Sequence, residues 1–205
     1  MSPKKLLLPL IAITIALTLV ASASAQTKPV LQPAHATIAS PAVTNDFIHQ
    51  QFGDNCSLLP DLPQFVGDLN GDGVDDLVVA AKCKNPMADR DEYGFQVADP
   101  YDDFLGFGDV RVTSTFASDQ PERRGVSLLI IHGVGKDAWR STEPKPKFLL
   151  INLPFKTLTV KRLSTKKRAM LAVFMEEQGE GEDTSSALFW DGKRYRYTQL
   201  GSTME

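Results

Sequence analysis

Short runs of apolar and β-branched residues, separated by polar turns, fill the second half of the chain and predict β-strands. Four such runs lie at residues 126–132, 147–153, 158–162 and 170–175. Each has the length of a strand and is too short for a typical helix. The chain ends in a predicted hairpin, where residues 187–190 and 193–197 flank Asp191-Gly192. An Asp-Gly pair between two such runs is typical of a two-residue type I′ turn.

One short helix is predicted after residue 44. Thr44 suits the N-cap and Gly53 the position after the last turn, while Phe47, Ile48 and Phe52 provide an apolar side. Strands otherwise dominate, and their spacing is irregular. We therefore expect a mainly β fold: a single antiparallel β-rich domain, sandwich-like or with a partial propeller-like sheet, and one short N-terminal helix.

Two predicted strands, residues 64–66 and 77–81, enclose the most specific motif of the chain. It reads Asp68-Leu69-Asn70-Gly71-Asp72-Gly73-Val74-Asp75-Asp76. Oxygen-bearing side chains occupy positions 1, 3, 5 and 9 of this loop, and a glycine occupies position 6. Calcium prefers several oxygen ligands, and a glycine lets the backbone curl around the ion. The motif therefore predicts one structural Ca²⁺ in a strand-loop-strand hairpin. An Asp/Asn/Gly-rich turn that binds nothing is the alternative.

The hairpin differs from an EF-hand, because position 12 is Val79, where an EF-hand has a bidentate Glu, and a strand follows in place of a helix. Residues 64–80 resemble the calcium hairpin of the FG-GAP and VCBS repeat families. The resemblance implies a main-chain ligand at Val74 and an outward-pointing Asp75. It also implies four side-chain ligands: Asp68, Asn70, Asp72 and Asp76. One copy of the loop is recognisable, so the chain does not form the usual propeller of four or more blades by itself.

Residues 1–25 have the layout of a signal peptide. Lys4 and Lys5 precede an apolar segment at residues 6–20, and Ala23-Ser24-Ala25 is a small-residue cleavage site. We expect cleavage near Ala25 and export to the periplasm or the outside of the cell. No later apolar stretch reaches the length of a membrane span, so we expect none in the mature chain.

The rest of the chain divides into two parts. Residues 26–43 are rich in Pro, Ala, Thr and Ser, which indicates a flexible lead, and residues 44–205 form the predicted β-rich domain. The formal net charge of the whole chain is -3. This mild acidity argues against nucleic acid as a partner.

Cys56 and Cys83 are the two cysteines of the chain and flank the predicted calcium hairpin. An exported protein folds under oxidising conditions, which favours a disulfide between them. Such a bridge would stabilise the hairpin region. There is no Cys-x-x-Cys motif that would indicate a redox function.

Charge is segregated along the chain. Residues 84–109 combine seven acids with aromatic residues, which is compatible with a second cation site, a binding surface or a solvated insertion. Residues 145–168 are basic and contain no acid. That stretch could bind an anionic partner such as an envelope polysaccharide or a lipid head group, protect edge strands from aggregation, or pair with the acidic residues.

No catalytic constellation or cofactor motif is recognisable. The three histidines are His35, His49 and His132, and the last ends an apolar run without a Gly-x-Ser-x-Gly motif anywhere in the chain. A packing or capping histidine at a strand end is the simpler interpretation. The clustered acids would also suit glycoside hydrolysis, but abundant acids do not point to one pair.

Together these features predict an exported, calcium-binding β domain without enzymatic activity, acting as a structural or interaction module. Its partner is unknown; an envelope polysaccharide or another envelope protein would fit. Two alternatives remain open. One is an envelope hydrolase acting on glycan or peptide, and the other is an adhesion or assembly subunit that contacts an anionic surface through residues 145–168.

Overall fold

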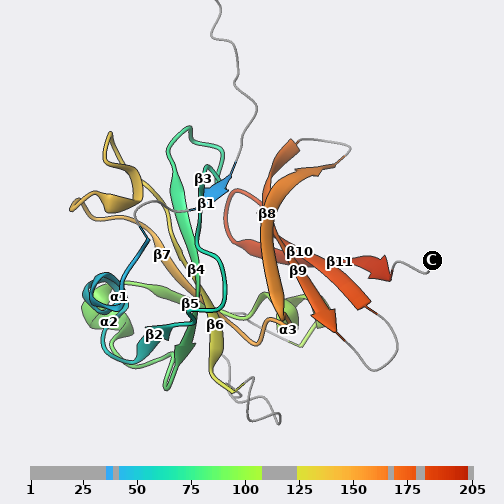
Figure 1. The fold of residues 1–205 in the computed structure, drawn as a ribbon, viewed down its shortest axis with the longest axis horizontal. Coiled ribbons are helices and arrows are strands. Elements are labelled where there is room, and N and C mark those ends of the chain that lie inside the picture. Colours follow the sequence, from blue (N-terminus) through green and yellow to red (C-terminus); the bar gives the residue numbers. More distant parts are fainter. Residues whose placement is uncertain (1–35, 39–41, 108–123, 166–168, 179–182, 203–205) are drawn as a thin grey trace, which may run out of the picture. The chain divides into compact units, whose positions relative to one another are not determined.

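Most elements of the computed structural model are strands, which form two open sheets (Figure 1). The structure describes residues 36–38, 42–107, 124–165, 169–178 and 183–202, all within one unit that begins at Pro33. The predicted signal segment lies outside these residues. The mainly β class expected from the sequence is confirmed.

The larger sheet contains seven strands in the order β1-β3-β4-β6-β7-β5, and β2 also pairs with β4. All pairs are antiparallel except β5 with β7, which is parallel. The strands are β1 (Thr37–Ile38), β2 (Cys56–Leu58), β3 (Phe65–Gly67), β4 (Asp76–Cys83), β5 (Gln96–Ala98), β6 (Val126–Ile131) and β7 (Lys147–Ile151). The predicted pairing of the strands on either side of the Asp/Asn/Gly loop is confirmed, because β3 pairs with β4. Strand β1 falls within the residues predicted as a lead.

The smaller sheet is an antiparallel sheet of four strands in the order β11-β10-β9-β8. They are β8 (Thr157–Ser164), β9 (Ala169–Gln178), β10 (Asp183–Trp190) and β11 (Tyr195–Ser202). Each of these strands is longer than the apolar run that predicted it. Polar residues at the strand ends continue the backbone ladder beyond the buried part, which an apolar pattern does not reveal.

The turn between β10 and β11 differs from the two-residue turn predicted from the sequence. Trp190 pairs with Tyr195, so the turn has four residues, 191–194, and is not a two-residue type I′ turn. The Asp191 Oδ1 atom accepts hydrogen bonds from the backbone N–H groups of Lys193 at 2.8 Å and Arg194 at 3.0 Å. The backbone N–H of Asp191 also donates to the carbonyl of Arg194 at 3.1 Å, so both the Asp side chain and the backbone hold this turn.

The predicted helix is confirmed as α1 (Asn45–Phe52). The Thr44 hydroxyl accepts a hydrogen bond from the backbone N–H of Phe47 at 3.3 Å, and Gly53 ends the helix with φ 81°. Three further short helices are α2 (Arg90–Tyr93), α3 (Pro100–Leu105) and the 3₁₀ helix η1 (Ala138–Arg140). None of the described helices is long and apolar enough to cross a membrane.

The larger sheet is buried on both faces. On one face, Leu77 and Val79 of β4 pack in a core with Ile48 and Phe52 of α1. On the other face, Val78 and Ala80 pack in a core that includes the inner residues of the smaller sheet. This two-sided burial explains why β4 is a continuous apolar run and lacks the alternation of a strand with one wet face.

Part of the acidic segment belongs to the fold. Phe95 and Val97 are buried in the core beneath α1, and β5 adds a strand to the larger sheet. Asp103 of α3 forms ion pairs with Arg194 at 3.4 Å and with Arg196 at 2.6 Å. Residues 95–103 are therefore not a solvated insertion, and the partners of Asp103 come from the C-terminal hairpin. Asp109 lies outside the described residues.

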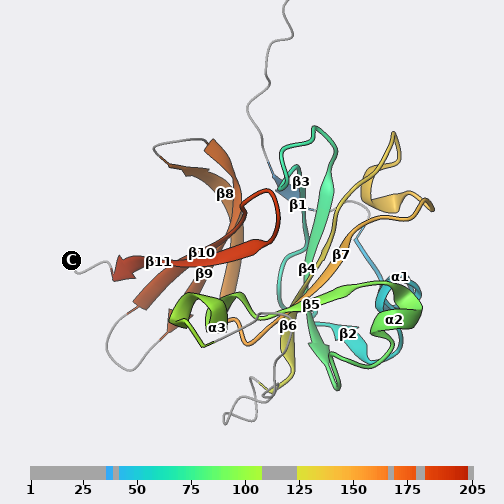
Figure 2. The same ribbon diagram turned by 180° about the vertical axis from the view of Figure 1, so that it is seen from behind.

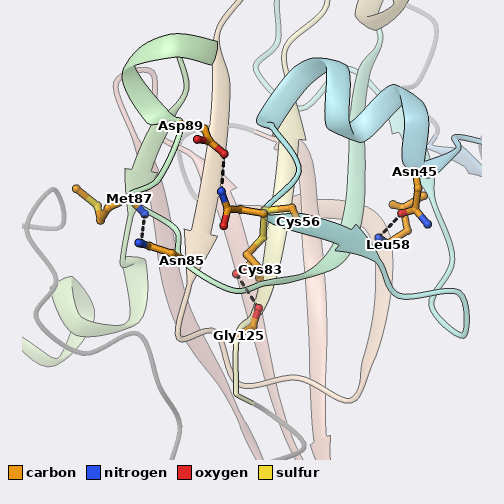
Figure 3. The surroundings of a disulfide bond; sticks show 10 residues. Asn45, Cys56, Leu58, Cys83, Asn85, Met87, Asp89 and Gly125 are labelled. Carbon is orange, nitrogen blue, oxygen red and sulfur yellow. Dashed lines mark hydrogen bonds between the residues drawn. A yellow bond between two sulfur atoms is a disulfide. The ribbon is translucent and has the colours of Figure 1, made fainter.

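The predicted disulfide between Cys56 and Cys83 is present and joins β2 to β4 (Figure 3). The two cysteines are direct partners in the antiparallel ladder, and both are buried. Beside the bridge, the backbone N–H of Cys83 donates to the carbonyl of Gly125 at 2.8 Å. The bridge lies at the end of β4 opposite the Asp/Asn/Gly loop and encloses that loop within a span of 27 residues.

We expect the double variant Cys56→Ala/Cys83→Ala to lose about 3–4 kcal/mol of unfolding free energy, because the unfolded chain regains the entropy of a closed loop. Urea denaturation of the variant against the oxidised wild type measures this difference. Reduced wild type should resemble the variant. Equal urea midpoints for the oxidised protein and the variant would contradict a stabilising bridge.

Candidate metal centre

The loop between β3 and β4 adopts the curled backbone that its glycines predict. Gly71 has φ 82° and Gly73 has φ 87°. Backbone in this left-handed region is accessible to glycine at little cost and strained for most other residues. The two glycines therefore let the loop reverse direction within a few residues.

Asp68 organises the backbone of this loop. Its Oδ1 atom accepts hydrogen bonds from the N–H groups of Gly71 at 2.7 Å and Asp72 at 3.1 Å, and its Oδ2 atom accepts from Gly73 N–H at 2.9 Å. Three backbone N–H groups of the loop therefore converge on one carboxylate. Asp68 thus lies over the turn and does not extend into solvent.

Asn70 and Asp72 are linked to each other and to the same turn. The Asn70 Nδ2 atom donates to Asp72 Oδ2 at 2.8 Å, and Asn70 Oδ1 accepts from the Asp72 N–H at 2.9 Å. The Asp72 Oδ1 atom accepts from Val74 N–H at 2.8 Å. Asp75 is exposed. The loop therefore brings together three of the four predicted side-chain ligands.

Asp76, the fourth, lies at the base of the loop and is fully buried, with 0 % of its surface exposed. Its Oδ2 atom accepts from the N–H groups of Leu69 at 2.9 Å and Asn70 at 3.3 Å. Its Oδ1 atom accepts from the N–H of Gly133 at 2.8 Å. Because Gly133 follows shortly after β6, this carboxylate connects the loop to a second strand of the sheet.

The environment of Asp76 disfavours its charge. The pKa of Asp76 is raised to about 7, chiefly by burial and to a smaller extent by the nearby charge of Asp72, while the three backbone N–H donors act in the opposite direction. A buried carboxylate of this kind is stabilised by a bound cation, which favours the ionised form.

Gly133 allows the backbone of the loop to approach the end of β6. A Cβ atom at this position would lie 2.2 Å from the carbonyl oxygen of Asp75 and 2.8 Å from Cγ1 of Val74. The contact with Asp75 involves backbone, which cannot rotate away. Only glycine fits between this segment and the loop.

His132 lies next to Asn70 of the loop and is only 3 % exposed. Its Nε2 atom is 2.7 Å from the Tyr195 hydroxyl, and its Nδ1 atom is 3.5 Å from Asn70 Nδ2. The ring packs against Phe148 and Trp190, with centroid distances of 4.9 Å and 5.0 Å. Burial lowers the pKa of His132 to about 4, so the imidazole is neutral at pH 7. The ring contacts agree with a packing role at a strand end.

Sequence reasoning did not connect His132 or Tyr195 with the loop. His132 is 62 residues from Asn70 and 63 residues from Tyr195. Only the pairing of β4 with β6, and the packing of the second sheet against them, brings the three segments together. Nothing local in the sequence could have indicated this contact.

The predicted ligands form a set of hard oxygen donors: three carboxylates, one amide and the carbonyl of Val74. Ca²⁺ prefers such a set over nitrogen or sulfur ligands. Within the described residues, no group of three or more His, Cys, Asp or Glu side chains is placed so that it could hold a metal ion as it stands. The donor chemistry fits Ca²⁺, and the side chains would have to turn from the backbone N–H groups toward the ion.

The titration of Asp76 predicts a pH dependence in the presence of chelator. Because the pKa of Asp76 rises from 3.8 to about 7 on folding, the folded state binds more protons in this interval, and its stability falls as the pH rises through it. In Asp76→Asn this contribution is absent. The unfolding free energy of the wild type minus that of the variant should therefore decrease from about pH 4 to about pH 7. The contribution of His132, present in both proteins, largely cancels.

Urea denaturation at several pH values measures this difference. Asp75→Asn is the matched control, because Asp75 belongs to the same loop and is exposed. A difference between wild type and Asp76→Asn that stays constant with pH would contradict a buried carboxylate with a raised pKa.

Gly133→Ala tests the close approach of the loop to β6. The added methyl group must displace the backbone at Asp75, so we expect a loss of about 2 kcal/mol or more, as for other overpacked sites. Gly135→Asn is the control, because nothing lies within 4 Å of a Cβ atom there and Asn tolerates the φ of 62°. Thermal unfolding of both variants measures the effect. Equal midpoints would show that the approach is not tight.

The chain was also compared with known proteins. No family model, no curated protein and no solved structure matches it.

Proposed function

We propose that this chain is an exported calcium-binding β domain of the FG-GAP/VCBS-like type that acts as a non-enzymatic structural or interaction module. The observation that carries this proposal is the arrangement of the loop between β3 and β4. Asp68, Asn70 and Asp72 turn toward one curled backbone segment, and Asp76 closes its base.

Electrostatics supports a cation at this loop. Asp68, Asp72 and Asp76 lie within nine residues, and none of them has a Lys or Arg partner among the ion pairs of the described residues. Asn70 connects two of these carboxylates, because it donates to Asp72 Oδ2 through its side chain and to Asp76 Oδ2 through its backbone N–H. Repulsion among three carboxylates without a counter-ion favours opening of the loop, and a divalent cation would remove that repulsion.

The position of the loop supports a structural role for the ion. It precedes β4, which pairs with β2, β3 and β6 in the larger sheet. A cation held here would restrain the start of a central strand. Ligand binding to the folded state alone stabilises it by RT ln(1 + [L]/Kd), and extracellular calcium is abundant enough to fill even a weak site.

The environment of His132 argues against a hydrolytic centre beside the loop. A general base must reach the proton that it removes from the substrate or its water. His132 is almost fully buried, one ring nitrogen faces the Tyr195 hydroxyl and the other faces Asn70. We therefore do not propose the hydrolase alternative.

The basic segment gives no specific support to an adhesive role. Lys147 donates through Nζ to the carbonyl of Gln51 at 2.8 Å, and Lys145 donates to the carbonyl of Ser141. These two lysines thus hydrogen bond within the fold. Residues 166–168, the densest part of the basic stretch that was predicted to contact an anionic surface, lie outside the described residues.

The disulfide supports the proposed export. Disulfides persist in oxidising compartments such as the periplasm and the extracellular space, and they are rare in the cytosol. The Cys56–Cys83 bridge is thus compatible with the signal-peptide layout of residues 1–25. Both features support a location in the periplasm or outside the cell.

Calcium should raise the thermal midpoint of the mature protein. At a Ca²⁺ concentration of about 100 Kd the gain is about 2.7 kcal/mol, which corresponds to a shift of about 5–10 °C for a domain of this size. Differential scanning calorimetry in millimolar Ca²⁺ and in excess chelator measures it. Mg²⁺, which demands a smaller octahedral site, should have a smaller effect.

Two variants locate the ion. Asp72→Asn removes a predicted ligand and should abolish most of the calcium-dependent shift, whereas Asp75→Asn, in the same loop, should keep it. If the wild type melts at the same temperature in calcium and in chelator, the proposed function is wrong. If both variants keep the shift, calcium binds elsewhere.

A further inference from the structure

A hollow lies away from the Asp/Asn/Gly loop, between the β5–β7 edge of the larger sheet and the turn that joins β10 to β11. Its volume is about 640 Å³, which is in the range of sites for small organic ligands. Figure 2 shows β5, the edge strand of the larger sheet, between α2 and α3. The hollow thus has one wall from each sheet.

The inner part of this hollow is apolar. Val97 and Ala98 of β5, Phe148 and Leu150 of β7, and the ring of Tyr195 line it. All except the half-buried Ala98 are buried residues of the two cores, and Phe148 and Tyr195 pack edge to face at 5.2 Å. These residues provide a rigid apolar surface for the body of a ligand.

The rim of the hollow is cationic. Lys193, Arg194 and Arg196 line it together with Asp191. Arg196 is held on both sides, because its Nε atom donates to Asp191 Oδ2 at 2.9 Å and its Nη1 atom donates to Asp103 Oδ2 at 2.6 Å. These two carboxylates balance the charge of Arg196. Its side chain thereby links the turn after β10 to α3 at the rim of the hollow.

The side chains of Arg194 and Lys193 are held less tightly by acidic residues than that of Arg196. The Nη1 atom of Arg194 reaches Asp103 Oδ1 at 3.4 Å, which is a long contact, and Lys193 is exposed. Their backbone is fixed by the two hydrogen bonds from their N–H groups to Asp191 Oδ1. Asp103 and Asp191 pair with Arg194 and Arg196, and Lys193 adds a third positive charge, so this part of the rim has one positive charge in excess.

We propose that this hollow binds a small organic anion that carries a single carboxylate on an apolar body. The body would lie against Ala98, Phe148 and Tyr195, and the carboxylate would meet the guanidinium of Arg194. The planar fork of Arg matches the two oxygens of a carboxylate. The excess of one charge on the rim favours a monovalent ligand over a phosphate or a nucleotide.

This inference goes beyond the proposed function and does not rest on it. The hollow contains none of the predicted calcium ligands. Tyr195 contacts both regions, since its hydroxyl bonds His132 and its ring lines the hollow. Failure of the calcium experiment would leave this proposal standing, and the reverse also holds.

The test uses octanoate as probe, below its micelle concentration, with isothermal titration calorimetry on the mature protein. Octan-1-ol has the same chain without charge, and acetate has the charge without the chain. We expect octanoate to bind with an affinity at least about tenfold higher than that of octan-1-ol, the difference that one charged hydrogen bond supports. Acetate should show no measurable binding. Absence of octanoate binding, or equal binding of octan-1-ol, would overturn the proposal.

Arg194→Gln should weaken octanoate binding about tenfold or more, whereas Lys82→Gln, at an exposed position outside the hollow, should change it less than about twofold. Thermal unfolding of both variants confirms that they fold. Amide NMR spectra with octanoate should show shifts centred on Gln96–Ala98 and residues 191–196. Unchanged affinity in Arg194→Gln, or shifts centred elsewhere, would contradict this site.

Discussion

Strand β4 is buried on both faces from Asp76 to Ala81, and most of the fold follows from this constraint. Leu77 and Val79 point to the core beneath α1, while Val78 and Ala80 point to the second sheet. An antiparallel sheet commonly keeps one wet face, but here each face needs its own cover. A helical layer and a four-stranded sheet provide these covers from segments on both sides of β4 in the chain. Strand β4 therefore lies inside the larger sheet and also between its two covers in the order of elements along the chain.

The register of β4 also determines the position of the Asp/Asn/Gly loop. A shift by one residue would move every side chain of the strand to the opposite face. It would also remove Asp76 from the three backbone N–H groups that offset its burial. The buried apolar side chains and the buried carboxylate therefore favour the same register. Gly133 adds a third restraint, because the loop and the end of β6 approach too closely for any side chain between them.

Local features of the fold could be predicted from the sequence, and long-range features could not. Thr44 and Gly53 mark the ends of α1, and the glycines of the loop mark its curled backbone, because these residues act on their own neighbours. The parallel pairing of β5 with β7 and the contact of His132 with Tyr195 depend on segments that are about 50 or more residues apart. The turn after β10 differed from the prediction because the Asp191 side chain accepts hydrogen bonds from the N–H groups of Lys193 and Arg194, which an Asp-Gly pair in the sequence does not reveal.

The two tryptophans of the chain lie in different layers. Trp139 is buried in the core beneath α1, where the ring of Phe47 packs against it at 5.3 Å. Trp190 belongs to the aromatic group formed by His132, Phe148 and Tyr195 between the two sheets. Each layer therefore carries its own intrinsic fluorophore. Replacing one indole with phenylalanine would leave emission from a single layer, so that optical spectroscopy could distinguish whether the helical cover and the second sheet detach from β4 in one cooperative step or in sequence.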